Sequence, residues 1–445
     1  MKRIGLGLAV MAAPAVGLLL LSPDARAGGF SLNEMSAASV GNAHAGGAAA
    51  AEDLSTIYFN PAGLSRMKGR QFMAAGSAIR PSAKFRNNGS TAASGPATGG
   101  DGGDAGKWSF VPALYYAMDL DFKPGLRFGI GVQSPFGLVT EYDANWVGRY
   151  QALKSELRSV DINPALSYQV NDLVSVGAGV SAQYVDTELS RAIDVGTACA
   201  ASPSCAPLGL RPQGADGKVT VKGNDWGYGF NLGALFTPGP SSRFGIAYRS
   251  RIRHSISGDA SFDRPAALPA SVASAFGLNN TGANARVDLP ESLSVSGYVN
   301  LDPRWAVMAD MTYTRWSRFK ELRISFANGS PDSVTPEEWR NTLRIAFAAN
   351  YRYSDAWKLR GGVAWDPTPV RDQFRTARIP DNDRTWLSFG AQYKLSDRSS
   401  VDFGYAHLFI RNASINKSEP PLGGNLVGTY KNDVNILSVQ YNQSF

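Results

Sequence analysis

Three arginines at alternate positions are the residues of this 445-residue chain whose spacing most directly suggests chemistry. In the stretch YRSRIRH, Arg249, Arg251 and Arg253 fall on one face of an extended strand. Like charges in a row repel each other, so they need acidic partners or an anionic ligand. Pairing with acids such as Asp310 or Asp402 is the more ordinary role, because buried charges are usually paired. A path for carboxylates is the alternative.

Histidine and serine residues give no sign of a catalytic or metal site. His44, His254 and His407 lie far apart in the sequence, and no serine motif or acidic residue marks one of them as an oriented base. The stretch GIGVQSPFG lacks the G-x-G-x-x-G spacing of a phosphate-binding loop. A lipase or protease is the enzymatic alternative, and these absences disfavour it. The sequence therefore predicts no enzyme, no metal site and no cofactor.

The first 27 residues are typical of a secretory signal peptide. Lys2 and Arg3 precede an apolar run, and the sequence ARA at 25–27 has the small residues of a cleavage site. The run is long enough for a membrane anchor, but Pro14 interrupts it and the cleavage site follows directly. We therefore predict a signal peptide at residues 1–27 and an exported protein.

The two cysteines of the chain lie close together in the stretch CAASPSC. In an oxidising compartment, Cys199 and Cys205 are expected to form a disulfide within a loop. Their spacing is not that of a C-x-x-C redox motif, and no histidine cluster accompanies them, which disfavours a metal site.

From residue 71 onward, the chain alternates apolar and polar residues in long stretches separated by turns. In WGYGFNLGALF, Trp226, Tyr228 and Phe230 share one face, whereas Gly227 and Asn231 share the other. This alternation is the period of a β-strand. Short turns alternate with long loops rich in Gly, Ser, Asn and Pro. We predict fourteen strands, which begin near residues 71, 108, 126, 156, 173, 223, 243, 286, 304, 339, 357, 384, 399 and 429.

An even number of antiparallel strands with short turns at one end and long loops at the other predicts an outer-membrane β-barrel at residues 71–445. A soluble β-sandwich or propeller is the alternative. The predicted inner faces carry charges such as Asp310, Arg344 and Arg352, which a packed core rejects and a wet lumen accepts. In a barrel, the row of arginines would face the lumen. A fourteen-stranded lumen is also too wide for side chains alone to fill.

Residues 28–70 do not follow the strand pattern. They are rich in Ala, Gly and Ser, and Asn60-Pro61 is a turn signal. Apolar residues such as Leu54, Ile57 and Phe59 favour burial inside the barrel over a disordered periplasmic tail. The predicted fold is therefore an all-β transmembrane protein, a 14-stranded antiparallel outer-membrane β-barrel plugged by a small N-terminal hatch at residues 28–70.

Several stretches resemble the FadL-type outer-membrane transporters of long-chain fatty acids and other hydrophobic compounds. They are GGFSLNEMSAASVGNAHAGGAAAAEDLSTIYFNPAGL, NDWGYGFNLGALF, LPESLSVSGYVNLDPRWAV, YTRWSRF, LRIAFAANYRYSDAWKLRGGVAWD and IPDNDRTWLSFGAQY. Together they run through nearly all of the chain after residue 27, with gaps at the long loops. The resemblance implies capture of an apolar ligand at the outer face, transfer to a pocket behind the hatch, and lateral exit through a gap in the third strand.

The third predicted strand, LRFGIGVQSPFGLVTEY, contains an interruption at Ser134, Pro135, Phe136 and Gly137. Proline cannot donate to a sheet ladder, and glycine weakens or bends a strand. A break in the barrel wall at 134–137 is therefore expected on physical grounds, independently of the resemblance. A bulge near the end of a strand is the simpler alternative.

The resemblance also implies ligand-binding residues. Arg191 matches an arginine of the family near the outer end of the fifth strand, and Asp366 matches an acidic position. A second basic residue of the family's pocket falls near Thr335, where this sequence has no Lys or Arg. Long-chain fatty acids are the first expectation, and neutral aromatic or aliphatic hydrocarbons are the alternative. The candidate ligand-binding residues are Arg191, Phe59, Asn60, Pro61, Asp366, Arg249, Arg251 and Arg253.

A general porin is the rival class, but an apolar plug would close its lumen.

The C-terminal LSVQYNQSF should form the last strand, with Leu437, Val439 and Tyr441 toward lipid and Phe445 read by the barrel-assembly machinery. Expected partners are a hydrophobic ligand, outer-membrane lipid and lipopolysaccharide, and we expect a monomer. The formal charge of +7 is modest and scattered, so nucleic acid is not an expected partner.

Overall fold

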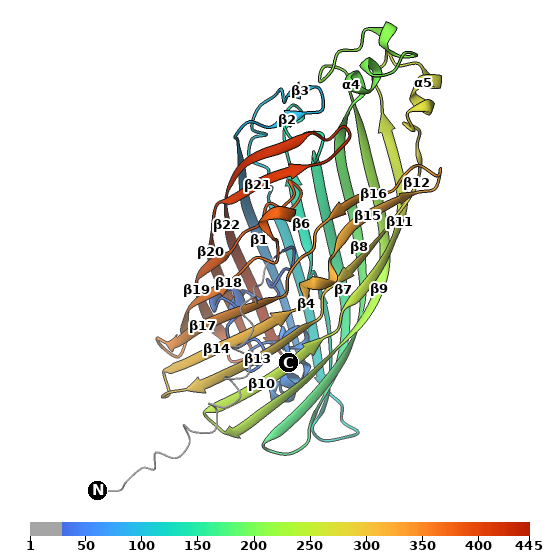
Figure 1. Ribbon diagram of the computed structural model, residues 1–445. Helices are drawn as coiled ribbons and strands as arrows, with labels where there is room; N and C mark the ends of the chain where they lie inside the picture. The colour runs from blue at the N-terminus through green and yellow to red at the C-terminus, as the bar shows by residue number, and fades with distance from the viewer. Residues whose placement is uncertain (1–28) are drawn as a thin grey trace, which may run out of the picture.

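A computed structural model describes residues 29–445 as a closed antiparallel barrel (Figure 1). The predicted signal peptide at 1–27 lies outside the described residues. None of the helices within 29–445 is long and apolar enough to cross a membrane. The long loops gather at one end of the barrel, and they carry α4 (Val195–Ala200) and α5 (Ala270–Ala275) at its tip. Short turns connect the strands at the other end.

The wall contains fourteen strands, which confirms the predicted number. Some of them are divided into two pieces by an irregular segment. In order, they are β1 (Gln71–Asn87), β4 (Ser109–Asp119), β5 (Leu126–Gln133) with β6 (Gly137–Glu141), β7 (Lys154–Gln169), β8 (Val174–Asp194), β9 (Asp216–Gly239), β10 (Ser242–Arg249) with β11 (Ile252–Asp263), β12 (Thr281–Leu289) with β13 (Ser292–Asn300), β14 (Trp305–Thr314) with β15 (Glu321–Phe326), β16 (Ser333–Pro336) with β17 (Thr342–Arg352), β18 (Trp357–Asp366), β19 (Arg384–Ser396), β20 (Ser399–Ile410) and β22 (Asn425–Ser444).

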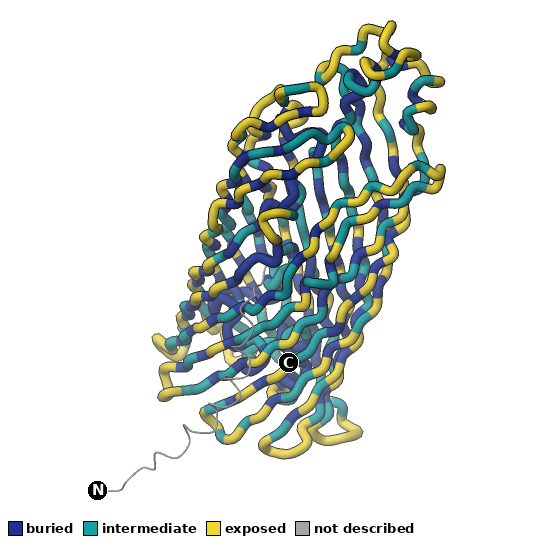
Figure 2. Tube along the Cα trace, viewed as in Figure 1, coloured by how far each residue is buried: buried dark blue, intermediate teal, exposed yellow. Residues whose placement is uncertain are grey.

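The barrel closes where the last strand pairs with the first. β22 runs antiparallel to β1 from Gln71 opposite Ser444 to Asn87 opposite Gly428. Closure leaves no free sheet edge at this seam, as a membrane requires. Leu437 and Val439 are more than half exposed, whereas Ser438 and Gln440 between them are buried. The predicted faces of this strand are therefore confirmed, and the same alternation runs along the other strands (Figure 2).

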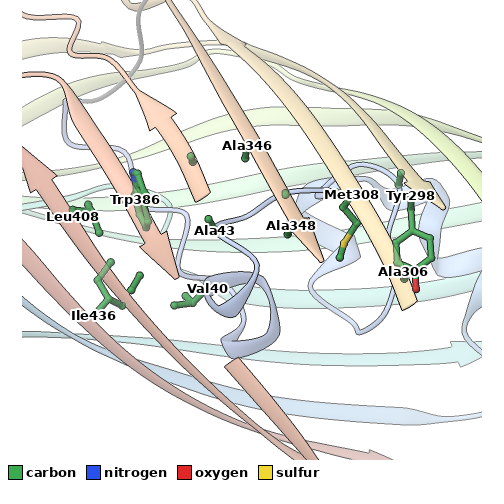
Figure 3. Packing of buried hydrophobic residues seen from close by; sticks show 14 of the residues in the cluster. Val40, Ala43, Tyr298, Ala306, Met308, Ala346, Ala348, Trp386, Leu408 and Ile436 are labelled. Atoms are coloured by element: carbon green, nitrogen blue, oxygen red, sulfur yellow. The ribbon is translucent and has the colours of Figure 1, made fainter. Parts of the chain in front are cut away.

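The segment 29–70 lies inside the barrel, in the half nearer the short turns (Figure 1). We call it the N-terminal segment. It contains α2 (Ala37–Gly41), α3 (Thr56–Phe59) and the 3-10 helix η1 (Pro61–Arg66). Ser36 caps α2 by accepting a hydrogen bond from the Ser39 amide at 3.0 Å. Val40 and Ala43 pack against the wall side chains Trp386, Leu408 and Ile436, among others (Figure 3).

Glycines in the wall allow the N-terminal segment to approach closely. A Cβ atom at Gly404 would lie 2.4 Å from the Ala37 carbonyl oxygen, and one at Gly362 would lie 2.4 Å from the Asn42 carbonyl carbon. At Gly390 it would lie 2.9 Å from Gly41. Real side chains do not tolerate such distances, so three neighbouring strands, β18, β19 and β20, carry glycine where α2 rests.

The loop after β8 forms a small satellite core above the barrel. Cys199 and Cys205 form a disulfide within this loop. Both are fully buried, and they pack with Val195, Leu268 and Ala273 from α4 and the region of α5. The bond therefore belongs to the tip of the long-loop end and lies outside the barrel lumen.

Candidate functional site

The third strand of the wall is interrupted between β5 and β6. Below the interruption, Leu114 of β4 pairs with Val132 of β5. Above it, an isolated bridge joins Gly106 to Thr140. Between these two points, the described residues 107–113 and 133–139 form no ladder with each other, although β6 still pairs with β7. We call this unpaired region the strand-3 window.

The start of the N-terminal segment runs along the strand-3 window from inside. The Leu32 amide donates to the Pro135 carbonyl at 2.8 Å, and the Gly137 amide donates to the Phe30 carbonyl at 3.0 Å. Ser31 forms an antiparallel bridge with Phe136. Residues 30–32 thus supply two of the backbone hydrogen bonds that the neighbouring wall strand does not make.

A cavity of about 840 Å³ lies beside this contact. It is bounded by the N-terminal segment, the inner wall and the rim of the strand-3 window, and this volume falls within the usual range of small-molecule sites. Several of the predicted site residues line it, namely Phe59, Pro61, Arg249, Asp366, Ser134, Phe136 and Gly137. Its lining does not include Asn60, Pro135, Arg191, Arg251, Arg253, Cys199 or Cys205.

An aromatic cluster lies beside the cavity, and its members Phe30, Phe136 and Trp316 line it. The ring of Phe30 lies 5.1 Å from Trp316, 5.7 Å from Trp339 and 6.0 Å from Phe136, measured between centroids. Phe319 completes the group at 4.9 Å from Trp339. All five side chains are buried. These distances are those of favourable aromatic pairs, so Phe30 is held by rings from the third strand and from the segments that follow β14 and β16.

The cations of the inner cavity are already engaged by protein groups. Arg249 lies 3.5 Å from Asp161, stacks at 4.0 Å over the Tyr58 ring and donates to the Tyr58 carbonyl. Arg344 donates to the Ala43 carbonyl and lies 4.0 Å from Asp310. Each of these two arginines thus links an acidic residue of the barrel wall to the N-terminal segment.

Arg384 and Asp366 lie together at another side of the cavity. Arg384 pairs with Asp381 at 3.0 Å and donates to the Gly29 carbonyl at 2.8 Å. Its guanidinium lies 4.0 Å from Asp366, which also accepts a hydrogen bond from the Trp386 indole at 3.2 Å. Asp366 is therefore a buried partner of Arg384 and Trp386 as well as a lining residue.

The prediction that the three alternate arginines share one inward face is wrong. Arg249 faces the lumen, but Arg251 lies in the break between β10 and β11 and is exposed. Past the break, Ile252 and His254 are buried and Arg253 is exposed, pairing with Asp288 at 3.0 Å. One extra residue in the seventh strand causes this reversal. Arg249 pairs with Asn231 of β9 and Ser257 pairs with Asn224, so the seventh strand advances by eight residues where β9 advances by seven.

The Asn60-Pro61 turn is a structural anchor. Asn60 is fully buried, and its amide nitrogen donates to the carbonyls of Ala48 at 2.6 Å and Ala234 at 3.1 Å. Its side-chain oxygen accepts from the Ala62 amide and so caps η1. Asn60 therefore ties the N-terminal segment to itself and to β9, while Phe59 and Pro61 on either side reach the cavity.

Arg191 lies near the long-loop end of β8, opposite Val219. It is half-buried, and its positive charge acts on Arg378 in the loop before β19. Arg378 donates to the carbonyls of Gln151 and Lys154. Burial lowers the pKa of Arg378 to about 10, and the charge of Arg191 contributes to the lowering. Two cations thus lie close together above the cavity.

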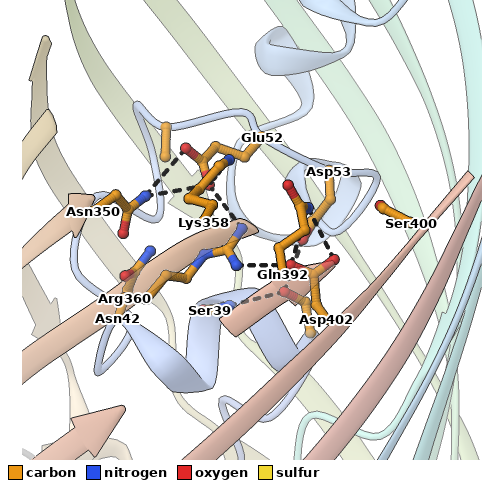
Figure 4. A network of polar contacts seen from close by, with 12 residues as sticks. Ser39, Asn42, Glu52, Asp53, Asn350, Lys358, Arg360, Gln392, Ser400 and Asp402 are labelled. Carbon is orange, nitrogen blue, oxygen red and sulfur yellow. Dashed lines mark hydrogen bonds and ion pairs between the residues drawn. The ribbon is translucent and has the colours of Figure 1, made fainter. Parts of the chain in front are cut away.

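A buried polar network anchors the N-terminal segment to the wall (Figure 4). Glu52 lies 3.3 Å from Arg360 and 3.5 Å from Lys358, and Arg360 pairs with Asp402 at 2.7 Å. Asp53 accepts hydrogen bonds from Ser36 at 2.9 Å and from Gln440 at 3.1 Å. Burial raises the pKa of Glu52, but Lys358 and Arg360 outweigh it and lower the pKa to about 2. The Glu52 carboxylate is therefore charged at any ordinary pH.

Glu34 is a cavity residue that the sequence analysis missed. It is buried, and its carboxylate accepts a hydrogen bond from the Asn33 amide at 2.9 Å. No cation among the described residues comes within ion-pair distance of it. Burial raises the pKa of Glu34 to about 7. In sequence, it is one acidic residue in a segment of small residues, and only the surrounding wall makes it unusual.

The fold and the cavity define a membrane-spanning barrel with a small-molecule-sized internal cavity. The profile of a family described as "Outer membrane protein transport protein (OMPP1/FadL/TodX)" matches residues 18–445. A "Long-chain fatty acid transport protein" of Shigella flexneri is 32% identical over 421 residues, covering 91% of this chain and 92% of that protein. The chain belongs to this family of outer-membrane transport proteins, and it is located in the outer membrane.

Solved structures agree with this assignment. A FadL homologue of Pseudomonas aeruginosa superposes with a TM-score of 0.86 at 26% identity, covering 94% of this chain and 100% of the other. The toluene transporter TodX of Pseudomonas putida superposes with a TM-score of 0.70 at 18% identity, covering 94% and 99%. The second likeness concerns the fold alone.

The raised pKa of Glu34 predicts that the N-terminal segment is held less firmly at high pH. When the segment is detached, the pKa of the carboxyl should return to its ordinary value of 4.5, so the attached state binds more protons between that pH and about 7. Attachment should therefore be strongest below 4.5 and weaken as pH rises to about 7, by on the order of 3 kcal/mol in total. Hydrogen exchange of residues 29–70 at pH 5 and pH 8, corrected for intrinsic rates, measures this change.

Glu34→Gln is the decisive variant for this effect, because it keeps the shape and removes the titration. We expect its exchange protection to be the same at both pH values, whereas Glu141→Gln, at an exposed cavity position, should behave like the unaltered protein. An unchanged pH dependence in Glu34→Gln would contradict the assignment to Glu34.

Proposed function

We propose that this protein is a passive outer-membrane channel for hydrophobic small molecules, with long-chain fatty acids as its principal ligands. The observation that carries the proposal is the cavity of about 840 Å³, whose lining runs from the aromatic cluster to the rim of the strand-3 window. An apolar ligand gains free energy when it leaves water for such a cavity, so no energy source is required. Relatives above 30% identity that bear the name of long-chain fatty acid transport proteins support the choice of ligand.

Capture is proposed at the long-loop end, where Arg191 and Arg378 lie close together. Two neighbouring cations repel each other, and an anionic headgroup between them would relieve that repulsion. Arg191 is the residue that the resemblance to the family marks for this role. The hydrocarbon chain would then pass toward the aromatic cluster below.

Release is proposed through the wall. Residues 30–32 of the N-terminal segment occupy the strand-3 window, so ligand can leave sideways only after they have moved. The side chain of Phe30 lies among the aromatic residues that a ligand would contact, and a ligand that displaces this ring would also loosen residues 30–32. Binding and opening are thereby coupled in one element.

Neutral aromatic or aliphatic hydrocarbons are the second candidate class. The observation in their favour is that Arg249, Arg344 and Arg384 already have acidic or carbonyl partners, so these three arginines are not free to bind a carboxylate. A general porin would need an open lumen, whereas the N-terminal segment packs against the wall with buried charges and apolar contacts. We also propose that ligands pass unchanged, without catalysis.

Arg191→Ala separates the two ligand classes. We expect the initial rate of labelled oleate uptake to fall roughly fivefold to tenfold, because one charge-assisted contact is lost at a half-buried site. Uptake of labelled toluene should not change. The measurement uses a strain that lacks its own transporter and is complemented with the variant. Oleate uptake at the unaltered rate would remove Arg191 from the carboxylate site.

Gly137→Trp tests lateral release. Gly137 lies on the rim of the strand-3 window, and a Cβ atom there would already approach the Leu32 side chain at 2.8 Å. A tryptophan should fill the opening and lower the uptake of oleate and toluene alike by more than tenfold. Gly361→Trp is the matched control, because a Cβ atom at Gly361 meets nothing within 4 Å. Equal uptake by both variants would count against exit through the wall.

A further inference from the structure

Lys107 differs from the other cations that line the cavity. Lys154 lies 2.7 Å from Glu156 and 3.2 Å from Glu188, and Arg158 also pairs with Glu156. The three inner arginines, Arg249, Arg344 and Arg384, pair with acidic residues of the wall or its loops. Within residues 29–445, Lys107 makes no ion pair or side-chain hydrogen bond, and it is exposed. The one uncommitted ammonium group in the described lining of the cavity therefore lies on the rim of the strand-3 window.

The residues next to Lys107 are apolar and face outward. Trp108 is 64% exposed and Phe110 is 71% exposed. Lys107 and Trp108 directly precede β4, in which Val111 is buried and Phe110 is exposed, and Lys107 also lines the inner cavity. The rim thus presents a cation next to two aromatic side chains that face lipid, which is the combination that suits an amphiphile with one anionic end.

An apolar groove continues from this rim along the outside of the barrel. Its volume is about 780 Å³, and Phe110 lines both this exterior groove and the inner cavity. The groove crosses β1, β22, β20 and β19, where Gly76, Val439, Phe403 and Ala391 lie side by side in register. Because neighbouring strands lie about 4.8 Å apart, the distance from β4 to β19 is about 19 Å, which suits an extended long-chain acyl tail.

We propose that Lys107 binds the carboxylate of the departing ligand at the strand-3 window while its acyl chain lies past Phe110 in the exterior groove. This inference rests on the proposed function and adds a second headgroup station to it, at the exit. The three inner arginines already have partners, so a carboxylate that passes them next meets a free cation at Lys107. The tail can leave the protein along the groove before the headgroup does.

The test compares oleate with methyl oleate, which has the same chain and no charge. Lys107→Met keeps the length of the side chain and removes its charge, and Lys84→Met is the control at an exposed lysine of β1 that lines neither cavity. We expect Lys107→Met to lower the initial rate of oleate uptake about fivefold, as for the loss of one exposed charge contact. Methyl oleate uptake should be unchanged, and Lys84→Met should not affect either probe.

A second variant tests the groove. Ala391→Trp adds a large side chain at its far end on a lipid-facing position, and Val363→Trp adds the same side chain to the lipid face outside the groove. Ala391→Trp should lower the uptake of both probes, and Val363→Trp should lower neither.

Equal losses of both probes in Lys107→Met would mean that the residue serves the wall or surrounding lipid headgroups, and would overturn the proposal, as would no loss at all. If the unaltered protein takes up neither probe, the proposed function fails first, and this inference fails with it.

Discussion

Every backbone N–H and C=O group in a membrane-spanning wall needs a hydrogen-bond partner, because lipid supplies none. The wall ladder is interrupted at the strand-3 window, and residues 30–32 supply hydrogen bonds to one side of it from inside. The bonds from Leu32 to Pro135 and from Gly137 to Phe30 turn the start of the N-terminal segment into a short extra strand. The β5–β6 side of the opening is thus not left as bare backbone while this segment stays in place.

The attachment of the N-terminal segment is strong in one region and weak in another. Around α2, glycines allow close approach, and Arg360 lies between Glu52 and Asp402 in a buried network. Breaking such a network leaves an unpaired buried charge, which is strongly unfavourable. Near residues 30–34, by contrast, the described contacts include no ion pair: they are backbone bonds to Pro135 and Gly137, the apolar packing of Phe30 and Leu32, and hydrogen bonds at Glu34. This contrast suits a segment whose beginning moves while its middle remains fixed.

Much of the fold could be predicted from the sequence because strand alternation is a local signal. The alternation of apolar and polar residues predicted the fourteen strands and the two faces of the last strand. The predicted beginnings of β9 and β12 fell several residues late, since these strands start at Asp216 and Thr281, above the region where lipid enforces an apolar face. The predicted inward face of the three arginines was wrong for a related reason. A single inserted residue exchanges the inner and outer faces of a strand, and the composition of the sequence does not reveal it. The exposed Lys107 and the buried Glu34 could not be recognised as unusual, since each owes its character to elements distant in sequence.

The central claim is that residues 30–32 close the strand-3 window and must leave it for ligand to pass. The most direct test is a disulfide between Ser31→Cys and Phe136→Cys, which face each other in an antiparallel bridge at a separation that suits such a bond. The account predicts that cells carrying the oxidised double variant take up no oleate, and that reduction restores uptake to the level of Phe136→Cys alone. Oleate uptake by the oxidised form at the rate of the reduced form would contradict it.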